Sequence, residues 1–587
     1  MSNDVASTDG GASAAPPTRR RRALWVAGVA GLTGVVGLAA LGGVAARDDK
    51  PNSDRVSDAQ STNRQNVSDA GGSDNAGKED GAKQDGGRND DLSGDDWSGF
   101  DDRSGKDDKR DEKDRTEQVP CDTDKLIQAI TFANSKDGGV LELAKGCTYT
   151  LTRNQDGDGL PVITQPITLK GEHTTIGRDA TADYFRILNV GPGGHLTLKG
   201  LSIKGGQTLE RAMTMDAATV WAPYSPSVRG TAAKPADAPG TAAKPADAPT
   251  AKPAAARAAT VAKPAAKAQA TSSVAAKAAV PTAKPATAGP ATSPLVEKPG
   301  FTDGAGVLVQ PGGRAEILDS ELLYNQSGGN GGGLANFGTT RLSKTTVAHN
   351  TAFFFGGGIF NAGVLQVDES KVKDNTGIIG GGGIANGAAG IFTDSVDGGS
   401  AWVYKSEITD NRTLGFGGGV LDVGGSTTLH ETTVSGNTAL LAGGGVAVAD
   451  SQLSLQHARV AGNSTAGVGG GVTVAFDSIA TVENTTIKDN TAGFFGAGLF
   501  NEDSVTTLRD SEVVGNRAVG PFARGGGIYN TDGGEVTLHG TWVAHNFATL
   551  PPGGIFNNLG STVTLDDESS ATANRPTNCF NVPDCFA

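Results

Sequence analysis

Residues 424–439 read GGSTTLHETTVSGNTA, a unit in which short runs of alternating apolar and polar residues end at an asparagine. A glycine cluster follows this asparagine, at 443–445. The same pattern recurs at spacings of 25 to 36 residues, and its asparagines are Asn325, Asn350, Asn375, Asn411, Asn437, Asn463, Asn490, Asn516 and Asn546. A repeat period of this size predicts a stacked architecture rather than a single globular core.

Each repeat is long enough for three short strands and three turns. We therefore expect an all-β fold, a single-stranded parallel β-helix with three strands per coil, in which the coils stack about 4.8 Å apart. The open ends of such a stack need covers. Apolar residues at helical spacing from Leu126 to Ala133 predict a short N-terminal capping helix, and residues 571–587 are the predicted C-terminal cap.

Composition narrows the class of protein. The 587 residues include 86 glycines and only 5% aromatic residues, which suits a repeat with many turns and argues against several conventional cores. A formal net charge of −14 excludes a strongly basic nucleic-acid binder. The four cysteines form two local pairs, Cys121/Cys147 and Cys579/Cys585, and we predict disulfides rather than a metal site because no histidines cluster with them. Disulfides imply an oxidising compartment.

The start of the chain agrees with export. Residues 1–22 form a basic, cytoplasmic n-region that ends in four arginines, and residues 23–46 are uncharged and long enough to span a bilayer. The same segment fits an export signal cleaved after Ala46. Both alternatives stay open, and both place the rest of the chain outside the cytoplasm. Residues 47–119 are acidic and nearly devoid of apolar side chains, so we predict a disordered linker.

The remaining chain divides by composition. Residues 120–206 are the predicted N-terminal cap and first coils, and residues 301–570 the repeat coils. Between them, residues 207–300 are rich in Ala, Pro and Lys and contain two consecutive copies of GTAAKPADAP from Gly230. This composition predicts a disordered insertion. It is either a tolerated surface insertion or a tether that binds an anionic envelope polymer.

We interpret the repeated asparagines as inward-turned side chains at tight turns. Stacked one coil apart, their amides would hydrogen-bond along the axis as a ladder, and Asn tolerates the left-handed backbone of a sharp corner. A ligand-binding role is the alternative.

A variable apolar segment separates each asparagine from its glycines. Stacking would align these segments along one edge, where they either form an interaction surface or pack on one another against the coils. The candidate interaction stripe consists of Phe353, Phe354, Phe355, Phe416, Phe494, Phe495 and Phe522.

The motif GGGIFN at 356–361 returns as GAGLFN at 496–501 and GGGIYN at 525–530. It resembles the repeats of right-handed parallel β-helix proteins of the pectin-lyase-like superfamily, and it is similar to those of chlamydial polymorphic outer-membrane proteins. The segment from Cys121 to Leu151 looks like the N-terminal cap of secreted actinobacterial members. The resemblance implies a right-handed coil but no activity, because this fold carries lyases, hydrolases, adhesins and passive rods alike.

Two short motifs imitate catalytic signatures of polygalacturonase-like enzymes. These are Asn530-Thr531-Asp532 and His539-Gly540, but the Asp-Asp and Arg-Ile-Lys motifs that should accompany them are missing. Asn530 also occupies a repeat position shared with Asn361 and Asn501. We therefore predict no catalytic residues.

No metal or cofactor site is predicted either, because the seven histidines are scattered over different coils. Asp374, Asp410 and Asp489 each precede a ladder asparagine. They form either a loose calcium row or a solvated face.

These observations predict a non-catalytic extracytoplasmic β-helix, a structural or adhesive, carbohydrate-binding protein of the cell surface. Its expected partners are cell-wall or extracellular polysaccharide or a surface protein, and the membrane if residues 23–46 are retained; no nucleic acid is expected. The alternative is a polysaccharide lyase or glycoside hydrolase. Its site would be built from residues distant in sequence. The one coil insert of note, at 389–400, carries Asp394 and Asp397 with Asp410 nearby in the sequence, which is too few acidic residues to assign an active site.

Overall fold

The structure is a computed structural model that describes residues 116–208, 300–388 and 396–585. The predicted n-region, the hydrophobic segment, and most of the acidic linker and of the Ala/Pro/Lys-rich insertion lie outside these ranges, so their predictions stay predictions. None of the helices in the described ranges is long and apolar enough to cross a bilayer.

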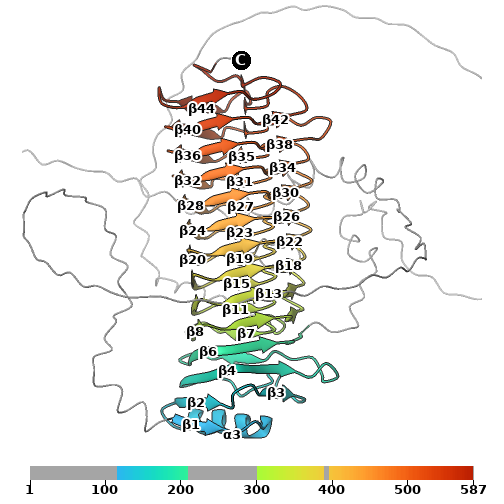
Figure 1. The fold of residues 1–587 in the computed structure, drawn as a ribbon, viewed down its shortest axis with the longest axis vertical. Helices are drawn as coiled ribbons and strands as arrows, with labels where there is room; N and C mark the ends of the chain where they lie inside the picture. The colour runs from blue at the N-terminus through green and yellow to red at the C-terminus, as the bar shows by residue number, and fades with distance from the viewer. Residues whose placement is uncertain (1–115, 209–299, 389–395, 586–587) are drawn as a thin grey trace, which may run out of the picture. The chain divides into compact units, whose positions relative to one another are not determined.

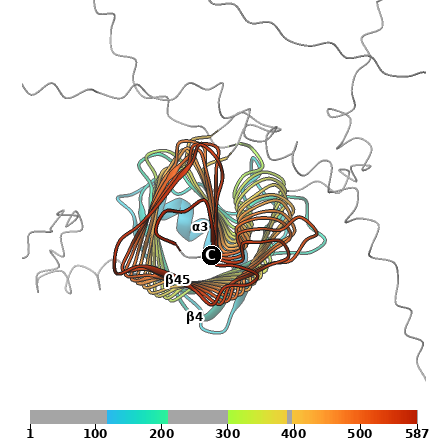
Figure 2. The same cartoon turned by 90° about the horizontal axis from the view of Figure 1, so that it is seen from above.

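The chain divides into two units, one made of residues 1–210 and 296–587 and the other of residues 211–295. All described residues belong to the first unit. Within it they form a parallel β-helix, which confirms the predicted fold class (Figure 1). Successive coils superpose when viewed along the stacking axis (Figure 2).

Sheet 1 has 25 strands. In the repeat coils it receives two strands per coil, separated by a two-residue corner, while β4 and β6 run through the corner without a break. Its strands are β1 (Thr116–Val119), β2 (Gly139–Leu143), β3 (Thr148–Leu151), β4 (Pro166–Arg178), β6 (His195–Lys204), β8 (Arg314–Leu318), β9 (Glu321–Leu323), β12 (Thr339–Ser343), β13 (Thr346–Ala348), β16 (Val364–Asp368), β17 (Lys371–Lys373), β20 (Ser400–Tyr404), β21 (Glu407–Thr409), β24 (Ser426–His430), β25 (Thr433–Ser435), β28 (Gln452–Gln456), β29 (Arg459–Ala461), β32 (Ile479–Glu483), β33 (Thr486–Lys488), β36 (Val505–Arg509), β37 (Glu512–Val514), β40 (Glu535–His539), β41 (Trp542–Ala544), β44 (Thr562–Leu565) and β45 (Ser570–Thr572).

Sheet 2 has 12 strands and sheet 3 has 9. The strands of sheet 2 follow the glycine clusters: β5 (Leu188–Val190), β7 (Val307–Val309), β11 (Leu334–Asn336), β15 (Ile359–Asn361), β19 (Ile384–Asn386), β23 (Val420–Val423), β27 (Val446–Ala449), β31 (Val472–Ala475), β35 (Leu499–Glu502), β39 (Ile528–Thr531), β43 (Ile555–Asn557) and β46 (Cys579–Phe580). Those of sheet 3 follow the ladder asparagines: β10 (Gln326–Ser327), β14 (Thr351–Ala352), β18 (Thr376–Gly377), β22 (Arg412–Thr413), β26 (Thr438–Ala439), β30 (Ser464–Thr465), β34 (Thr491–Ala492), β38 (Arg517–Ala518) and β42 (Phe547–Ala548).

Alternation within the strands separates core from surface. In β24, Thr427 and Leu429 are buried inside the coil, whereas Ser426, Thr428 and His430 face outward. A strand has a side-chain period of two, so stacking in register extends each inward position into a buried column, and the column of Leu429 is apolar throughout. A single core cluster follows these columns from Val119 to Val582.

The repeated asparagines form a continuous amide ladder. Each side-chain Nδ2 donates to the Oδ1 of the asparagine one coil further on at 3.0 Å. Each backbone N–H donates to the same Oδ1, at 2.9 Å for Asn411 and 3.0 Å for Asn437. The ladder continues from Asn546 to Asn574 at 3.0 Å. From the coil of Asn325 to that of Asn574, each coil is thereby hydrogen-bonded to the next through a buried side chain.

The sequence predicts that the asparagine itself adopts the left-handed backbone of this corner. This prediction is wrong, because the left-handed residue is the one directly before the asparagine. Tyr324, His349 and Asp374 have φ angles of 53°, 57° and 54°. This position also accepts glycine, as at Gly436 with φ of 67°. The asparagine is selected for its buried amide, and the preceding residue absorbs the strained turn.

A second column of hydrogen-bonding side chains, which we call the hydroxyl column, runs along the two-residue corner within sheet 1. Its members are hydroxyl residues that accept a backbone N–H from the preceding coil, as buried Ser370 does from Thr345 at 3.0 Å and half-buried Ser569 from Thr541 at 3.0 Å. Ala458 stands in this column without a hydroxyl, although its own N–H donates to Thr485 Oγ1 at 3.1 Å.

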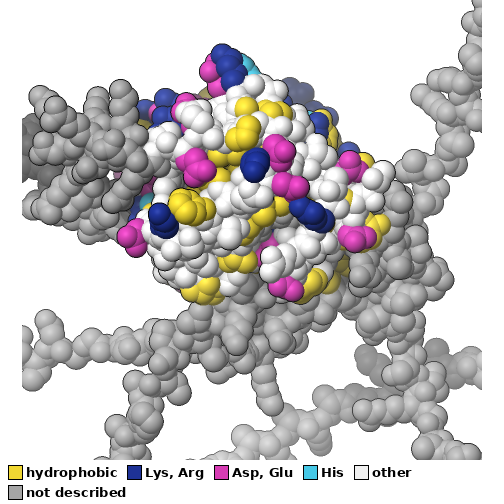
Figure 3. Space-filling model, turned by 90° about the horizontal axis from the view of Figure 1, so that it is seen from below, with side chains coloured by type: hydrophobic (Ala, Val, Ile, Leu, Met, Phe, Trp, Pro, Cys, Tyr) yellow, Lys and Arg dark blue, Asp and Glu magenta, His cyan; other side chains and the backbone are white. Residues whose placement is uncertain are grey.

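The N-terminal end is covered by α3 (Thr123–Asn134), whose Leu126, Ala129, Ile130 and Ala133 are buried. Asp122 caps this helix by accepting from the N–H groups of residues 124 and 125, which satisfies donors that a helix start leaves open. Seen from this end, hydrophobic, acidic and basic side chains are interspersed (Figure 3).

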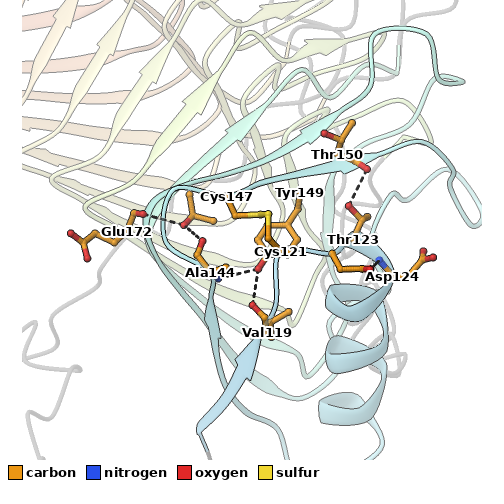
Figure 4. The surroundings of a disulfide bond; sticks show 11 residues. Val119, Cys121, Thr123, Asp124, Ala144, Cys147, Tyr149, Thr150 and Glu172 are labelled. Atoms are coloured by element: carbon orange, nitrogen blue, oxygen red, sulfur yellow. Dashed lines mark hydrogen bonds between the residues drawn. A yellow bond between two sulfur atoms is a disulfide. The ribbon is translucent and has the colours of Figure 1, made fainter.

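A disulfide joins Cys121 before the helix to Cys147 in the first coil (Figure 4). Beside it, the Tyr149 hydroxyl donates to Val119 O at 2.9 Å and accepts from Ala144 N at 3.0 Å. Val119 ends β1, which pairs with β2, so the folded part starts earlier than predicted and the linker does not extend to 119.

The C-terminal end is closed by the chain after β45. There β46 pairs with β43, and a disulfide joins Cys579 to Cys585. Cys579 and Val582 are buried against the core. The closing segment is therefore a short irregular tail rather than a helix.

We predict that Asn437→Ala strongly destabilises the protein. The change removes the acceptor of Asn411 N and Asn411 Nδ2 and the donor to Ile408 O, all of them buried. Each unsatisfied buried group costs about 1–3 kcal/mol, so we expect a loss of about 3 kcal/mol or more in denaturant unfolding. Gln452→Ala, at an exposed position of β28, is the control and should stay within about 0.5 kcal/mol of wild type. Similar losses in both variants would contradict the ladder's role.

A hydroxyl at position 458 should complete the hydroxyl column. We expect Ala458→Thr to be more stable than Ala458→Val by about 1 kcal/mol, because the two side chains have similar volumes and only threonine offers the acceptor. Thermal unfolding of the two variants measures the difference, and equal stabilities would show that the column does not hold coils together.

Candidate functional site

The ladder asparagines are not accessible to a ligand. The nine predicted members are 0–1% exposed, and their amide groups bond to neighbouring coils. They therefore act inside the fold, and the functional surface lies elsewhere.

The candidate interaction stripe does not form one exposed surface. Phe355 and Phe416 are only 2% exposed and belong to a second apolar cluster on the outer face of sheet 2. Phe353, Phe354, Phe494 and Phe495 are partly buried, and only Phe522, at 64%, is largely exposed among the seven. The segments between the asparagines and the glycines mainly cover sheet 2.

The catalytic look-alike is a structural element. Asn530 is fully buried and pairs in register with Asn501 and Asn557. Its Nδ2 donates to Asn557 Oδ1 at 3.0 Å, and its Oδ1 accepts from Asn501 Nδ2. These residues of sheet 2 belong to a second column of hydrogen-bonded asparagine amides, which we call the second amide column. His539 lies on the outer face of sheet 1, where Nδ1 is 3.2 Å from Asp566 Oδ2.

The acidic row also stays at the turns. Asp374, Asp410 and Asp489 each have a left-handed backbone and directly precede a ladder asparagine in the sequence. Within the described ranges, no three His, Cys, Asp or Glu side chains are grouped so that they could hold a metal ion. Asp394 lies outside these ranges, so the alternative site near 389–400 cannot be built from them.

Rings gather instead on the outer face of sheet 1. The aromatic patch consists of Trp402 and Tyr404 on β20, His430 on β24, and His457 after β28, together with the corner residues Lys405 and Glu431. These residues come from three successive coils, because β20 pairs with β24 and β24 with β28.

The geometry of the aromatic patch leaves ring surface open. Trp402 is 39% exposed and meets His430 edge-on, with an interplanar angle of 87° at 6.1 Å. Tyr404 and His457 lie 5.3 and 5.8 Å from the His430 ring. The rings therefore form a shared apolar platform on a rigid sheet, with His430 at its centre.

Charges border the aromatic patch in pairs. Lys405 Nζ lies 4.8 Å from the centre of the Tyr404 ring and 3.6 Å from a Glu431 carboxylate oxygen. A hydrogen bond with Tyr404 and the charge of Glu431 raise the pKa of Lys405. Since these side chains are exposed, the ion pair contributes little to stability. Because the positive charge of Lys405 is paired with the negative charge of Glu431, the patch has no strong preference for a charged ligand.

The outward rows beside the rings carry hydrogen-bonding groups. Thr428 and Ser454 occupy the same cross-section position as Trp402, and Gln456 that of His430. Hydroxyl and amide side chains both donate and accept. The patch thus combines apolar ring surface with neutral polar groups.

This patch was not predicted from the sequence, because its histidines lie far apart along the chain. His430 and His457 are in adjacent coils and touch. A usable signal existed: Tyr404 and His430 stand at the same distance before their ladder residues, Asn411 and Asn437. Aligning every coil on its ladder asparagine would have placed them in one column.

A second group of rings lies over sheet 2, where rings of successive coils stack face to face. Tyr529 stacks at 4.7 Å on Phe556 and at 5.7 Å on Phe500, with interplanar angles of 7° and 12°. Next to it, burial and the neighbouring Asp532 raise the pKa of Glu502 to about 7, and the two carboxyl groups share a hydrogen bond. This stack holds neighbouring coils together, and its last ring, Phe580, is 50% exposed.

The second amide column is interrupted at a buried acid and resumes at Asn501. Asn336, Asn361 and Asn386 bond in sequence, and Asn386 Nδ2 donates to Asp422 Oδ2 at 3.1 Å. Asp422 is fully buried and also accepts from Thr427 Oγ1 at 2.6 Å. Removal from water raises the pKa of this carboxyl to about 6, although its hydrogen bonds act in the opposite direction.

A comparison with protein families agrees with the fold. A family model described as a right-handed β-helix region matches residues 386–548, which spans the aromatic patch. The A-module of mannuronan C-5 epimerase AlgE6 from Azotobacter vinelandii is similar at 13% sequence identity with a TM-score of 0.39, covering 78% of this chain and 96% of that one. This likeness is too distant to carry an argument about activity. A comparison with curated proteins gives no match.

The buried acid makes stability depend on pH. Because the pKa of Asp422 is raised from 3.8 to about 6 on folding, the folded protein binds this proton more tightly than the unfolded chain does. Its contribution to stability therefore rises as the pH falls from about 7 to about 4. Relative to Asp422→Asn, which cannot titrate, the wild type should gain roughly 2–3 kcal/mol over this range. Denaturant unfolding of both proteins at several pH values measures the difference, and a pH-independent difference would refute the assignment.

Proposed function

We propose that this protein is a non-catalytic extracytoplasmic β-helix that binds polysaccharide through the aromatic patch. The observation that carries the proposal is the platform of Trp402, Tyr404, His430 and His457 on a rigid sheet face. Sugar rings have apolar C–H faces that pack on aromatic rings, and hydroxyl rims that exchange hydrogen bonds with neutral polar side chains. The patch offers both.

Location outside the cytoplasm has independent support. The two disulfides are typical of oxidising compartments. The predicted export or anchor segment at 23–46, and the likeness of residues 121–151 to the cap of secreted actinobacterial β-helix proteins, point the same way. We therefore place the binding face at the cell surface or in the medium.

Binding without cleavage is the better-supported form of this function. A glycosidase needs two carboxyl groups about 5 Å or more apart around the scissile bond. The aromatic patch contains one carboxylate, Glu431, and the pair Glu502–Asp532 is in hydrogen-bond contact. Neither arrangement frames a glycosidic bond. The lyase or hydrolase alternative is therefore tested alongside binding.

We predict that Trp402→Ala lowers retention on polysaccharide at least tenfold, because it removes a tryptophan ring of the platform that is 39% exposed. Trp542→Ala is the matched control: Trp542 is 41% exposed on the outer face of β41, outside the aromatic patch. It should retain affinity within twofold. Sedimentation with insoluble cellulose, chitin and cross-linked polygalacturonate provides the measurement, and the thermal midpoint of each variant monitors folding.

Two results would contradict the proposed function. Absence of retention on every polysaccharide would remove the binding role, and equal losses in both tryptophan variants would remove the patch as its location. Release of new reducing ends or unsaturated products during incubation would replace binding with catalysis.

A further inference from the structure

A groove lies on the outer face of the first coils. It has a volume of about 920 Å³, and its floor is formed by outward residues of β3, β4, β6 and β9. Hydroxyl groups line much of it: Thr148, Thr150, Thr175 and Ser202. A cavity of this size can take several sugar units.

The groove follows from an irregularity in the first coils. The pairing of β4 with β6 shifts register between Lys170 and Thr174, where β4 bulges. The bulge carries Glu172 and His173 to one wall, and Lys145 holds Glu172 by an ion pair at 2.6 Å. The repeat coils have short two-strand corners instead, so this hollow belongs to the start of the stack.

The charges of the groove are mixed. Asp319, Glu321 and Glu172 are acidic, whereas Lys204 and Arg178 are basic. The Arg178 guanidinium is already engaged by Gly205 O at 3.0 Å and Ala182 O at 2.9 Å. Lys204 Nζ lies 5.2 Å from the centre of the Tyr324 ring. The groove therefore lacks the cluster of positive side chains that a polyanionic ligand would need. The formal net charge of −14 also disfavours binding of a polyanion.

The groove and the aromatic patch lie on one line along the stack. Asp319, at the groove wall, occupies the corner of sheet 1, and the strand registers place Lys344, Glu369 and Lys405 at the same corner in successive coils. Glu431 and His457 continue the row. At about 4.8 Å per coil, the three steps from Asp319 to Lys405 span about 14 Å.

We propose that a neutral, linear polysaccharide binds lengthwise along this corner and contacts the groove and the aromatic patch at the same time. The inference rests on the proposed function and specifies its ligand class and direction. The lengthwise direction follows because the sugar units of a linear chain and the coils of the protein would both repeat along the stacking axis. The neutral ligand class follows because neither the groove nor the aromatic patch has a strong excess of one charge. Occupying both regions with one chain raises affinity through the effective concentration of the second contact.

The test compares long and short ligands on matched variants. Ser202→Arg fills the groove, and Thr486→Arg is its control. Thr486 has the same cross-section position, because the registers connect Glu321, Thr346, Lys371, Glu407, Thr433, Arg459 and Thr486 from coil to coil. Both positions are half-buried on the outer face. Glu321→Ala, a smaller change at the groove wall, is used in addition in case Ser202→Arg alters folding.

Affinity electrophoresis in gels containing hydroxyethyl cellulose, laminarin, mannan or polygalacturonate measures polymer binding, and calorimetry with the trisaccharide of each retained polymer measures short-ligand binding. We expect at least one neutral polymer to retard the wild type. Ser202→Arg should lower the polymer affinity about tenfold and leave the trisaccharide affinity within twofold. Trp402→Ala should lower both, and Thr486→Arg neither.

The outcomes separate this inference from the proposed function. If both groove variants, Ser202→Arg and Glu321→Ala, keep full polymer affinity while Trp402→Ala loses it, the lengthwise mode is wrong and the proposed function stands. If polygalacturonate retards the wild type more than every neutral polymer does, the ligand class is wrong. If no polymer retards the wild type, both proposals are wrong.

Discussion

The structure depends on one interaction, the hydrogen bond between the buried amides of successive coils. An asparagine amide has donors and an acceptor that cannot be left without partners in an apolar interior. Here each Oδ1 accepts two N–H groups of the preceding coil, as Asn463 does from Asn437 N and Nδ2. This requirement fixes the register of one coil on the next. The apolar columns, the three sheets and the outward rows all inherit that register.

The fixed register of one coil on the next determines which residue positions can vary without disturbing the fold, and these positions are available for ligand binding. The corner residues before the amides and before the buried hydroxyls adopt the left-handed backbone, yet their side chains face solvent and vary among Asp, Lys, Glu, His and Tyr. In the same way, the outward positions of sheet 1 vary, while the inward ones stay buried and are mostly apolar. Recognition can therefore be changed coil by coil without disturbing the interior. The aromatic patch is one such local choice on a regular scaffold.

The sequence predicted the stack because its decisive signal is periodic. Asn437 and its equivalents mark the coil boundaries directly, and the alternation around Leu429 identifies the inward face. What could not be predicted depends on cross-section geometry. Trp402 and His430 meet only after the two coils are superposed, and the groove arises from a bulge at Glu172 and His173 that has no counterpart in the repeat. The left-handed residues were also missed, since Tyr324, Asp374 and Gly436 share a backbone conformation but no chemistry.

The two disulfides occupy the first and last coils, and their position has a kinetic consequence. In a quasi-one-dimensional stack each coil is held by its neighbours, so fraying starts where a coil has only one. Cys121–Cys147 ties the chain before the capping helix to the first coil, and Cys579–Cys585 closes the last turn over the core. Crosslinks at these places resist the opening of the ends. The unfolding rate of the described stack is thus governed by its two end coils rather than by the many coils between them.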